Sequence, residues 1–229
     1  MKRKKNLFFA MSLLCITGSA WVYGSNENTE TAIVHQSPVR VQSASTKENA
    51  KILVAYFTMP ETDGVDALSG ASRLVSNGKL YGNTEYVATL IAEATQAELF
   101  PIQTVRTYPG SHKELVDAAK QEADAKEHPR LKAHIDNLKE YDIIFVGYPN
   151  WWYDMPMPLY TFFEEHDFTG KTVIPFCTHG GSRFSQSVKT ITEIEKGATV
   201  LQGPSVSRER VEEAKGSVTK WLQKQGFIK

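Results

Sequence analysis

Three short apolar runs stand out in the pattern of hydrophobic and polar positions along the chain. They cover residues 51–57, 142–148 and 172–177. Each run is almost continuously apolar and rich in β-branched or aromatic residues, which is typical of a strand covered on both faces. Residues 98–104 and 198–201 are weaker candidate strands.

Helical patterns lie between these strands. Val87, Leu90, Ile91 and Ala94 illustrate them, because apolar residues three and four apart share one face of a helix. Thr84 is placed to cap this helix. The expected helices cover residues 84–95, 113–126, 158–166, 185–195 and 208–225. Alternating strands and helices predict an α/β fold, with a parallel sheet covered by helices on both faces.

The alternation is interrupted at residues 59–80, where the first strand should lead directly into its helix. The segment contains PETDGVDALSGASRLVSNGK, which is rich in Gly, Ser and Asp. A long loop inside a compact domain usually has a function. We therefore expect an inserted loop at this position.

Residues 1–24 have the pattern of a signal peptide or an N-terminal anchor. A basic cluster precedes the apolar run 7–16, and small residues follow it, including Ala20 and Gly24 as candidate cleavage positions. Cys15 leaves open a lipid attachment that would tether the protein to a membrane. Residues 25–50 are polar and form an expected linker. The sequence thus predicts an exported protein, periplasmic or otherwise extracytoplasmic.

Charge and cysteine content narrow the partners of the mature chain. The whole sequence has 26 basic and 26 acidic residues, and removal of the four basic residues at positions 2–5 leaves 22 against 26. A mildly acidic protein is a poor partner for nucleic acid. Without the leader, Cys177 is the only thiol, and we expect it to be a small buried residue at a strand end rather than a reactive group.

Ligands of doubly wound sheets bind at the carboxyl ends of the strands, so the segments after the strongest strands carry the candidate chemistry. Thr58 follows the first strand, and Gly82, Asn83 and Thr84 precede the first helix beyond the insertion. Backbone N–H groups at a helix start can hold a phosphate, although ordinary helix capping explains the same residues.

The other two segments suit a flat heterocycle. Pro149, Asn150, Trp151 and Trp152 follow a buried strand, and two of the four tryptophans of the chain are adjacent there. An aromatic ligand stacked on indole explains them, and so does a loop that folds back over the sheet edge. In the third segment, Thr178, Gly180 and Gly181 allow backbone amides to approach a ligand closely.

Together these segments resemble the flavodoxin-like family, in particular its short-chain bacterial branch with a Trp-Trp ring loop and a Gly-Gly third loop. The resemblance covers residues 51–229 and implies a five-stranded parallel doubly wound sheet of strand order 2-1-3-4-5, in a three-layer α/β/α sandwich that binds FMN. It further implies that Thr58, Asn83 and Thr84 surround the phosphate with Gly82 shaping the turn, that Pro149, Asn150, Trp151 and Trp152 line the isoalloxazine ring, and that Thr178, Gly180 and Gly181 meet its pyrimidine edge.

The sequence departs from the family pattern in two ways. The insertion separates Thr58 from Gly82, which the family's phosphate loop normally joins directly, and the mature chain is less acidic than electron carriers of this family. The insertion would cover the flavin or restrict its partners.

Three functions are compatible with these residues and with the resemblance. The first is electron transfer through one FMN, with a redox protein or a small acceptor as partner. The second is reduction of a quinone or other small acceptor by NAD(P)H on the same fold, and the third is a flavin-free exported binding module. No catalytic side chain or metal site emerges from the sequence.

Histidines and arginines near the predicted site carry one more hypothesis. His179, Arg183 or the amides of Gly180 and Gly181 would stabilise negative charge on reduced flavin, or Arg183 would be a solvated surface charge. The remaining histidines are expected to be exposed; they are His112, His128, His134 and His166.

Overall fold

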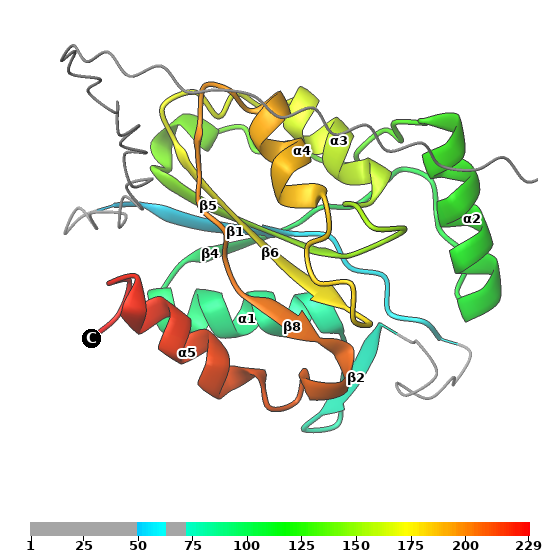
Figure 1. The fold of residues 1–229 in the computed structure, drawn as a ribbon, viewed down its shortest axis with the longest axis horizontal. Coiled ribbons are helices and arrows are strands. Elements are labelled where there is room, and N and C mark those ends of the chain that lie inside the picture. Colours follow the sequence, from blue (N-terminus) through cyan, green and yellow to red (C-terminus); the bar gives the residue numbers. More distant parts are fainter. Residues whose placement is uncertain (1–49, 63–71) are drawn as a thin grey trace, which may run out of the picture. The chain divides into compact units, whose positions relative to one another are not determined.

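The computed structural model describes residues 50–62 and 72–229. The predicted leader, Cys15, all of the predicted linker except Ala50, and the middle of the insertion lie outside the described residues. The described residues form a twisted sheet between two helical layers (Figure 1). No helix among them is long and apolar enough to cross a membrane.

The central sheet is parallel throughout and has the strand order β4-β1-β5-β6-β7, with β8 pairing β6 beyond the end of β7. The strands are β1 (Ile52–Tyr56), β4 (Glu98–Pro101), β5 (Ile143–Pro149), β6 (Thr172–His179), β7 (Thr199–Val200) and β8 (Ser205–Ser207). When β7 and β8 are taken as one interrupted strand, this is the expected 2-1-3-4-5 order. The predicted fold class is confirmed.

Helices cover both faces of this sheet, as the alternation predicted. On one face lie α1 (Asn83–Thr95) and α5 (Ala214–Lys224), and on the other lie α3 (Met157–Glu164) and α4 (Ser187–Ile194), with α2 (His112–Ala125) beside α3 (Figure 1). Val54, Phe145 and Ile174 pair across three strands and pack against α1 and α5. All three side chains are fully buried, which explains the uninterrupted apolar runs.

The end of the insertion is a β-hairpin, where a loop was expected. Its strands are β2 (Arg73–Ser76) and β3 (Lys79–Gly82), paired antiparallel. Asn77 and Gly78 make the turn with φ of 51° and 75°. An Asn-Gly pair with both residues at positive φ is the favoured connection of two-residue hairpins. The hairpin therefore follows from a local signal that the loop prediction overlooked.

The structure also corrects the start of α1. The N-cap is Gly82 rather than Thr84, and the carboxylate of Glu85 accepts the Gly82 N–H at 3.3 Å. Strand β3 runs directly into the helix, so the chain becomes helical one residue earlier than expected. Thr84 lies inside the first turn, and its hydroxyl is available for a contact across the sheet edge.

Other boundaries differ because of strand pairing, glycine and local turns. The predicted strand 98–104 ends at Pro101, which pairs with Tyr56, the residue at which β1 also ends. The predicted strand 198–201 shortens to β7, because the chain then bends at Gly203 toward β8. The predicted helix 208–225 divides into the 3-10 helix η3 (Arg208–Arg210) and α5.

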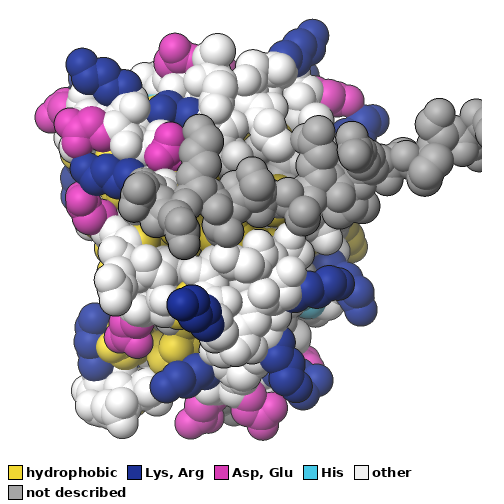
Figure 2. Space-filling model, turned by 90° about the vertical axis from the view of Figure 1, so that its left-hand side faces the viewer, with side chains coloured by type: hydrophobic (Ala, Val, Ile, Leu, Met, Phe, Trp, Pro, Cys, Tyr) yellow, Lys and Arg dark blue, Asp and Glu magenta, His cyan; other side chains and the backbone are white. Residues whose placement is uncertain are grey.

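The amino ends of the strands form a mixed-charge surface. Figure 2 views the molecule from the side on which β1 begins, and basic and acidic side chains are interspersed there. Lys51, just before β1, pairs with Glu140 at 2.8 Å and with Glu98 at 3.9 Å. These ion pairs are exposed. The candidate site lies at the opposite end of the sheet, where the strands finish.

Candidate cofactor-binding site

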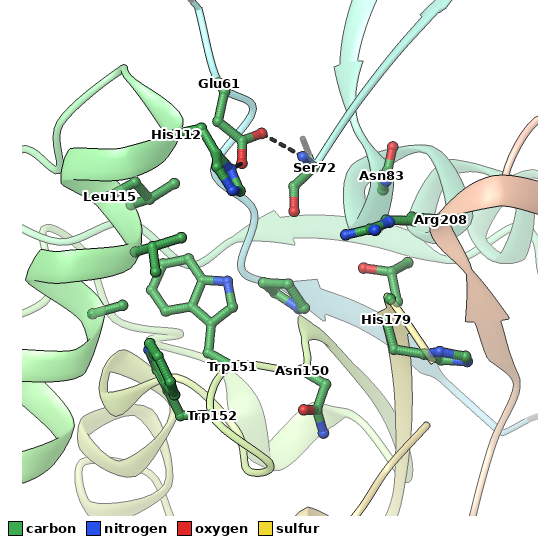
Figure 3. A pocket seen from close by; sticks show the side chains of 15 residues that line it. Glu61, Ser72, Asn83, His112, Leu115, Asn150, Trp151, Trp152, His179 and Arg208 are labelled. Atoms are coloured by element: carbon green, nitrogen blue, oxygen red, sulfur yellow. Dashed lines mark hydrogen bonds and ion pairs between the residues drawn. The ribbon is translucent and has the colours of Figure 1, made fainter. Parts of the chain in front are cut away.

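The three predicted ligand segments converge on one cavity at the carboxyl ends of β1, β5 and β6. The cavity has a volume of about 190 Å³. Seven of the eleven predicted site residues line it: Asn83, Pro149, Asn150, Trp151, Trp152, Thr178 and Gly180. Figure 3 shows Asn83 at the start of α1 and Asn150, Trp151 and Trp152 in the Trp-Trp loop around this cavity. The geometry is thus consistent with the prediction that the segments after the strongest strands carry the candidate chemistry.

A second hollow, of about 540 Å³, adjoins the cavity. It shares Asn150, Trp152 and Gly180 with the cavity and is completed by Tyr153, Gly181 and Ser182. Gly181 therefore belongs to the neighbouring hollow rather than to the main cavity.

Three predicted residues support the cavity without lining it. A Cβ on Gly82 would overlap the Thr58 side chain, so only glycine permits this close approach. The Thr84 hydroxyl lies 2.8 Å from the Thr178 hydroxyl, and both residues are buried. The insertion therefore separates Thr58 from Gly82 in the sequence but returns them to contact in space.

Buried polar atoms without partners cluster at this site. Within residues 50–62 and 72–229 they are Thr58 Oγ1, Asn83 Oδ1, Asn150 Nδ2 and Arg208 Nε. A buried polar group left unpaired costs about 1–3 kcal/mol, so such groups are normally satisfied. Their concentration around one cavity indicates that a polar ligand completes their hydrogen bonds.

The adjacent tryptophans have different environments. Trp151 is half-buried and meets Phe57 and Tyr108 edge-to-face, at centroid distances of 5.5 and 5.8 Å. Trp152 is 45% exposed, and Lys120 Nζ lies 5.5 Å from the centroid of its ring. Folding over the sheet edge therefore explains Trp151 in part, whereas Trp152 remains largely exposed despite its contact with Lys120.

The backbone around Trp152 is strained. Trp152 and Tyr153 have φ of 51° and 67°, in the left-handed region that bulky residues rarely adopt. Such strain costs of order 1–3 kcal/mol and persists where the surroundings impose it, commonly at ligand sites. This backbone conformation places the indole of Trp152 at the boundary between the two hollows.

The third loop presents a neutral histidine. The Gly181 N–H donates to His179 Nδ1 at 2.9 Å. Burial, and secondarily the charge of Arg183, lower the pKa of His179. Because its ordinary value is already below 7, the imidazole is uncharged at neutral pH. Arg183 is exposed and does not line the cavity.

Residues outside the three predicted segments form the other wall of the cavity. Leu115, Val116 and Ala119 come from α2. Their helical spacing predicted only a buried face, with no sign of what that face would contact. Arg208 also lines the cavity; it began a predicted helix but belonged to none of the three predicted ligand segments.

A buried acid–histidine pair closes the same wall. Glu61 is 3% exposed, accepts a hydrogen bond from the Ser72 N–H, and lies 3.1 Å from His112 Nδ1 (Figure 3). The expectation that His112 is exposed is wrong: it is half-buried, because the described start of the insertion packs on the N-terminus of α2.

The other residues outside the predicted site gave mixed outcomes. His166 is half-buried and its Nε2 accepts the Ile135 N–H at 3.0 Å, so it too departs from the expected exposure, whereas His128 and His134 are exposed. Cys177 is fully buried, and burial raises the pKa of its thiol to about 12. The prediction that Cys177 is a small buried residue is confirmed.

Comparison with known proteins identifies the family. The family model described as flavodoxin matches residues 72–225, which is more than half of the chain. The chain belongs to the flavodoxin family. The matched range includes every predicted site residue except Thr58. Glu61, in the cavity wall, also precedes the match.

Solved structures agree with this assignment. A protein of Bacteroides uniformis ATCC 8492 described as a flavoprotein is 30% identical, with 75% of this chain and 99% of that chain covered and a TM-score of 0.57. A similar protein of Bacteroides eggerthii DSM 20697 is 25% identical, with 75% and 99% covered and a TM-score of 0.55. A flavoprotein of Lactobacillus acidophilus NCFM, solved in complex with FMN, shares the fold at 19% identity, with 76% and 99% covered and a TM-score of 0.53. No curated protein matched the sequence.

The cavity of this flavodoxin-family chain suits the expected cofactor. Family membership bears out FMN, and the residues present fit it. Thr58, Asn83 and Arg208 supply unpaired hydrogen-bond donors and acceptors, and the indoles supply an apolar wall. The N-terminus of α1 provides the positive end of a helix dipole beside them.

Proposed function

We propose that this protein binds one FMN non-covalently and acts as an electron carrier. The observation that carries the proposal is the group of four unpaired polar atoms around a tryptophan-lined cavity. They come from the ends of β1 and β8, the start of α1 and the Trp-Trp loop, so one extended ligand would satisfy them all.

The arrangement supports a direction for the cofactor. Thr58 and Asn83, beside the first turn of α1, would hold the phosphate end, with Gly82 and Thr84 shaping that turn. Asn150 and Trp152 would contact the ring, and the backbone at Gly180 would meet its pyrimidine edge. Pro149 and Trp151 would exclude water from the inner side of the ring.

The bound flavin supplies the redox chemistry, and the chain controls access and potential. A redox protein or a small electron acceptor would then be the partner. Trp152 is exposed beside both hollows, so a partner that docks near it would reach the flavin most directly.

A second candidate function is reduction of a small acceptor by NAD(P)H on the same site. The hollow of about 540 Å³ beside Trp152 favours it, because a nicotinamide or a quinone needs room next to the flavin. Steady-state oxidation of NADPH with a quinone would distinguish this enzyme from a carrier, which shows no such turnover.

The cofactor itself is tested by the absorption spectrum of the purified protein, followed by removal of bound flavin and titration with FMN. We expect a flavin spectrum and stoichiometric uptake of FMN. A colourless protein that takes up no FMN would support the flavin-free binding module instead.

The phosphate end is tested with Thr58→Val, which keeps the shape of the side chain but removes the unpaired hydroxyl. The loss of one hydrogen bond to a charged group predicts an affinity for FMN about tenfold weaker, with affinity for riboflavin unchanged. Thr192→Val, on the exposed side of α4, is the matched control and should bind FMN like the wild type.

We also propose that the protein is exported, with residues 1–24 as its signal or anchor. The support is the sequence pattern alone. Cell fractionation with N-terminal sequencing of the recovered protein tests it, and an intact N-terminus in the cytoplasmic fraction would contradict it.

A further inference from the structure

Arg208 is a cation built into the wall of the cofactor cavity. It begins η3 directly after β8, and Figure 3 shows its side chain reaching between Asn83 and His179. A Cβ on Gly180 would lie 3.0 Å from Arg208 Nη1 and 3.2 Å from Cζ, so the guanidinium packs closely on the backbone of the third loop. The absence of a side chain at Gly180 makes room for the arginine.

Nothing in the described part of the chain neutralises this cation. Its Nε is buried without a hydrogen-bond partner, and no ion pair involves Arg208 within residues 50–62 and 72–229. Arg210 in the same short helix is different, since it is 78% exposed and lies 3.7 Å from Glu213. The carboxylate in the cavity wall, Glu61, already interacts with Ser72 and His112.

Arg208 is also the only lysine or arginine among the fifteen described residues that line the cavity. The two side chains named by the sequence hypothesis do not supply a charge there. His179 is neutral at pH 7, because burial lowers its pKa. Arg183 has a left-handed backbone, is exposed, and lies outside the lining.

A guanidinium with a buried, unpartnered nitrogen calls for an acceptor that carries negative charge. Gly180, on which Arg208 packs, belongs to the loop that would meet the pyrimidine edge of FMN. Reduction of the flavin by two electrons with uptake of one proton leaves a negative charge on that edge. Charge near this edge is one of the means by which a protein tunes a bound flavin.

We propose that Arg208 donates to the pyrimidine edge of the flavin and stabilises its reduced, anionic form. The inference rests on the proposed FMN site and replaces Arg183 and His179 as the source of positive charge. Because the guanidinium is partly shielded from water, its interaction with the anion is stronger than that of a surface arginine. Arg208 therefore raises the reduction potential and favours the fully reduced cofactor.

The test compares Arg208→Gln with Arg208→Lys and with the control Arg210→Gln in the full chain. Dissociation constants for oxidised FMN and riboflavin come from fluorescence quenching, and the midpoint potential comes from reductive titration against a reference dye. For Arg208→Gln we expect affinity for the reduced flavin to fall about tenfold more than affinity for the oxidised form. This corresponds to a potential about 30 mV lower for a two-electron couple.

The variants separate charge from shape. Arg208→Lys keeps the charge and should retain part of the potential, whereas Arg210→Gln should match the wild type. Gly180→Ala places a Cβ 3.0 Å from Nη1, so the guanidinium must shift by a few tenths of an ångström, and the potential should fall in the same direction but by less. This second route keeps the test valid if Arg208→Gln folds poorly.

Two outcomes overturn the inference. One is an unchanged potential in folded Arg208→Gln and Gly180→Ala. The other is a loss of affinity for FMN but not for riboflavin with the potential unchanged, which would place Arg208 at the phosphate. Failure of the proposed function itself is distinct, since the wild-type protein would then bind neither flavin.

Discussion

At the scale of single residues, the two adjacent tryptophans divide structural and ligand-binding roles. Trp151 packs on Phe57 and Tyr108, so it belongs to the core of the sheet edge. Trp152 is held outward by a left-handed backbone and stays 45% exposed. Within the described residues, the exposed indole gains little beyond its contact with Lys120, and a strained backbone of this kind is common at ligand sites.

This division predicts opposite effects of two alanine substitutions. Trp151→Ala should lower the free energy of unfolding by about 1–3 kcal/mol, because a half-buried ring leaves a cavity. Trp152→Ala should change it by less than about 0.5 kcal/mol, yet weaken FMN binding by about 0.5–1.5 kcal/mol through lost stacking. Urea unfolding of the flavin-free protein and FMN titration measure the two quantities. Equal effects of both substitutions on unfolding would contradict the division.

At the scale of elements, the start of α1 depends on a contact that the sequence separates. Strand β3 and the helix meet at Gly82, and Gly82 meets Thr58 at the end of β1. The buried hydroxyl pair of Thr84 and Thr178 then ties this helix start to β6. One rigid junction therefore positions the phosphate end of the site relative to the ring end.

Two glycines, one at the N-cap of α1 and one inside α5, test this junction. Gly82→Ala places a Cβ against Thr58 and should lower the free energy of unfolding by about 1–3 kcal/mol. Gly216→Ala, in α5, meets nothing within 4 Å and should raise it by about 0.5–1 kcal/mol, because alanine favours helix. Thermal or urea unfolding of the flavin-free variants measures both. A neutral Gly82→Ala would show that the junction is loose.

The two variants should also differ in cofactor binding. Gly82→Ala shifts Thr58, so FMN affinity should fall with the stability. Gly216→Ala lies on a different element and should leave FMN affinity unchanged. A loss of affinity in both variants would indicate that global stability, and not the junction, controls binding.

At the scale of the whole molecule, the sequence predicted the architecture well because its signals are local. The apolar runs and helical stripes are read from neighbours in the chain, and they indicated the parallel sheet and the helical layers, while the strand order was implied by the resemblance. The predicted loops also meet where expected, since parallel strands end at one edge. Strand β8 escaped prediction because it has three residues, of which Val206 alone is buried and apolar.

The missed part of the site depends on long-range packing. Arg208 comes from the far end of the chain, and Glu61 from an insertion, and no spacing connects either to the Trp-Trp loop. Their roles follow only from burial and from the absence of partners at Arg208 Nε within the described residues. The hairpin at Asn77 and Gly78 is different, since its turn residues were a sufficient local signal.

The stability of the whole molecule should depend on pH through a buried acid on α2. Glu122 is 2% exposed; it accepts hydrogen bonds from Tyr108 at 2.7 and 2.9 Å and pairs with Arg106. Burial raises its pKa above 4.5, and the contacts with Tyr108 and Arg106 only partly oppose this. The folded protein therefore binds more protons than the unfolded chain just above pH 4.5.

It follows that the contribution of Glu122 to stability is greatest below pH 4.5 and declines as the pH rises through its folded pKa. Urea midpoints at several pH values isolate this contribution. The midpoint of the wild type minus that of Glu122→Gln should fall as the pH rises. Glu140 is the control of opposite sign, because its hydrogen bond with Lys51 lowers its pKa. The midpoint of the wild type minus that of Glu140→Gln should rise as the pH rises. The same trend in both variants would exclude the buried carboxyl as the cause.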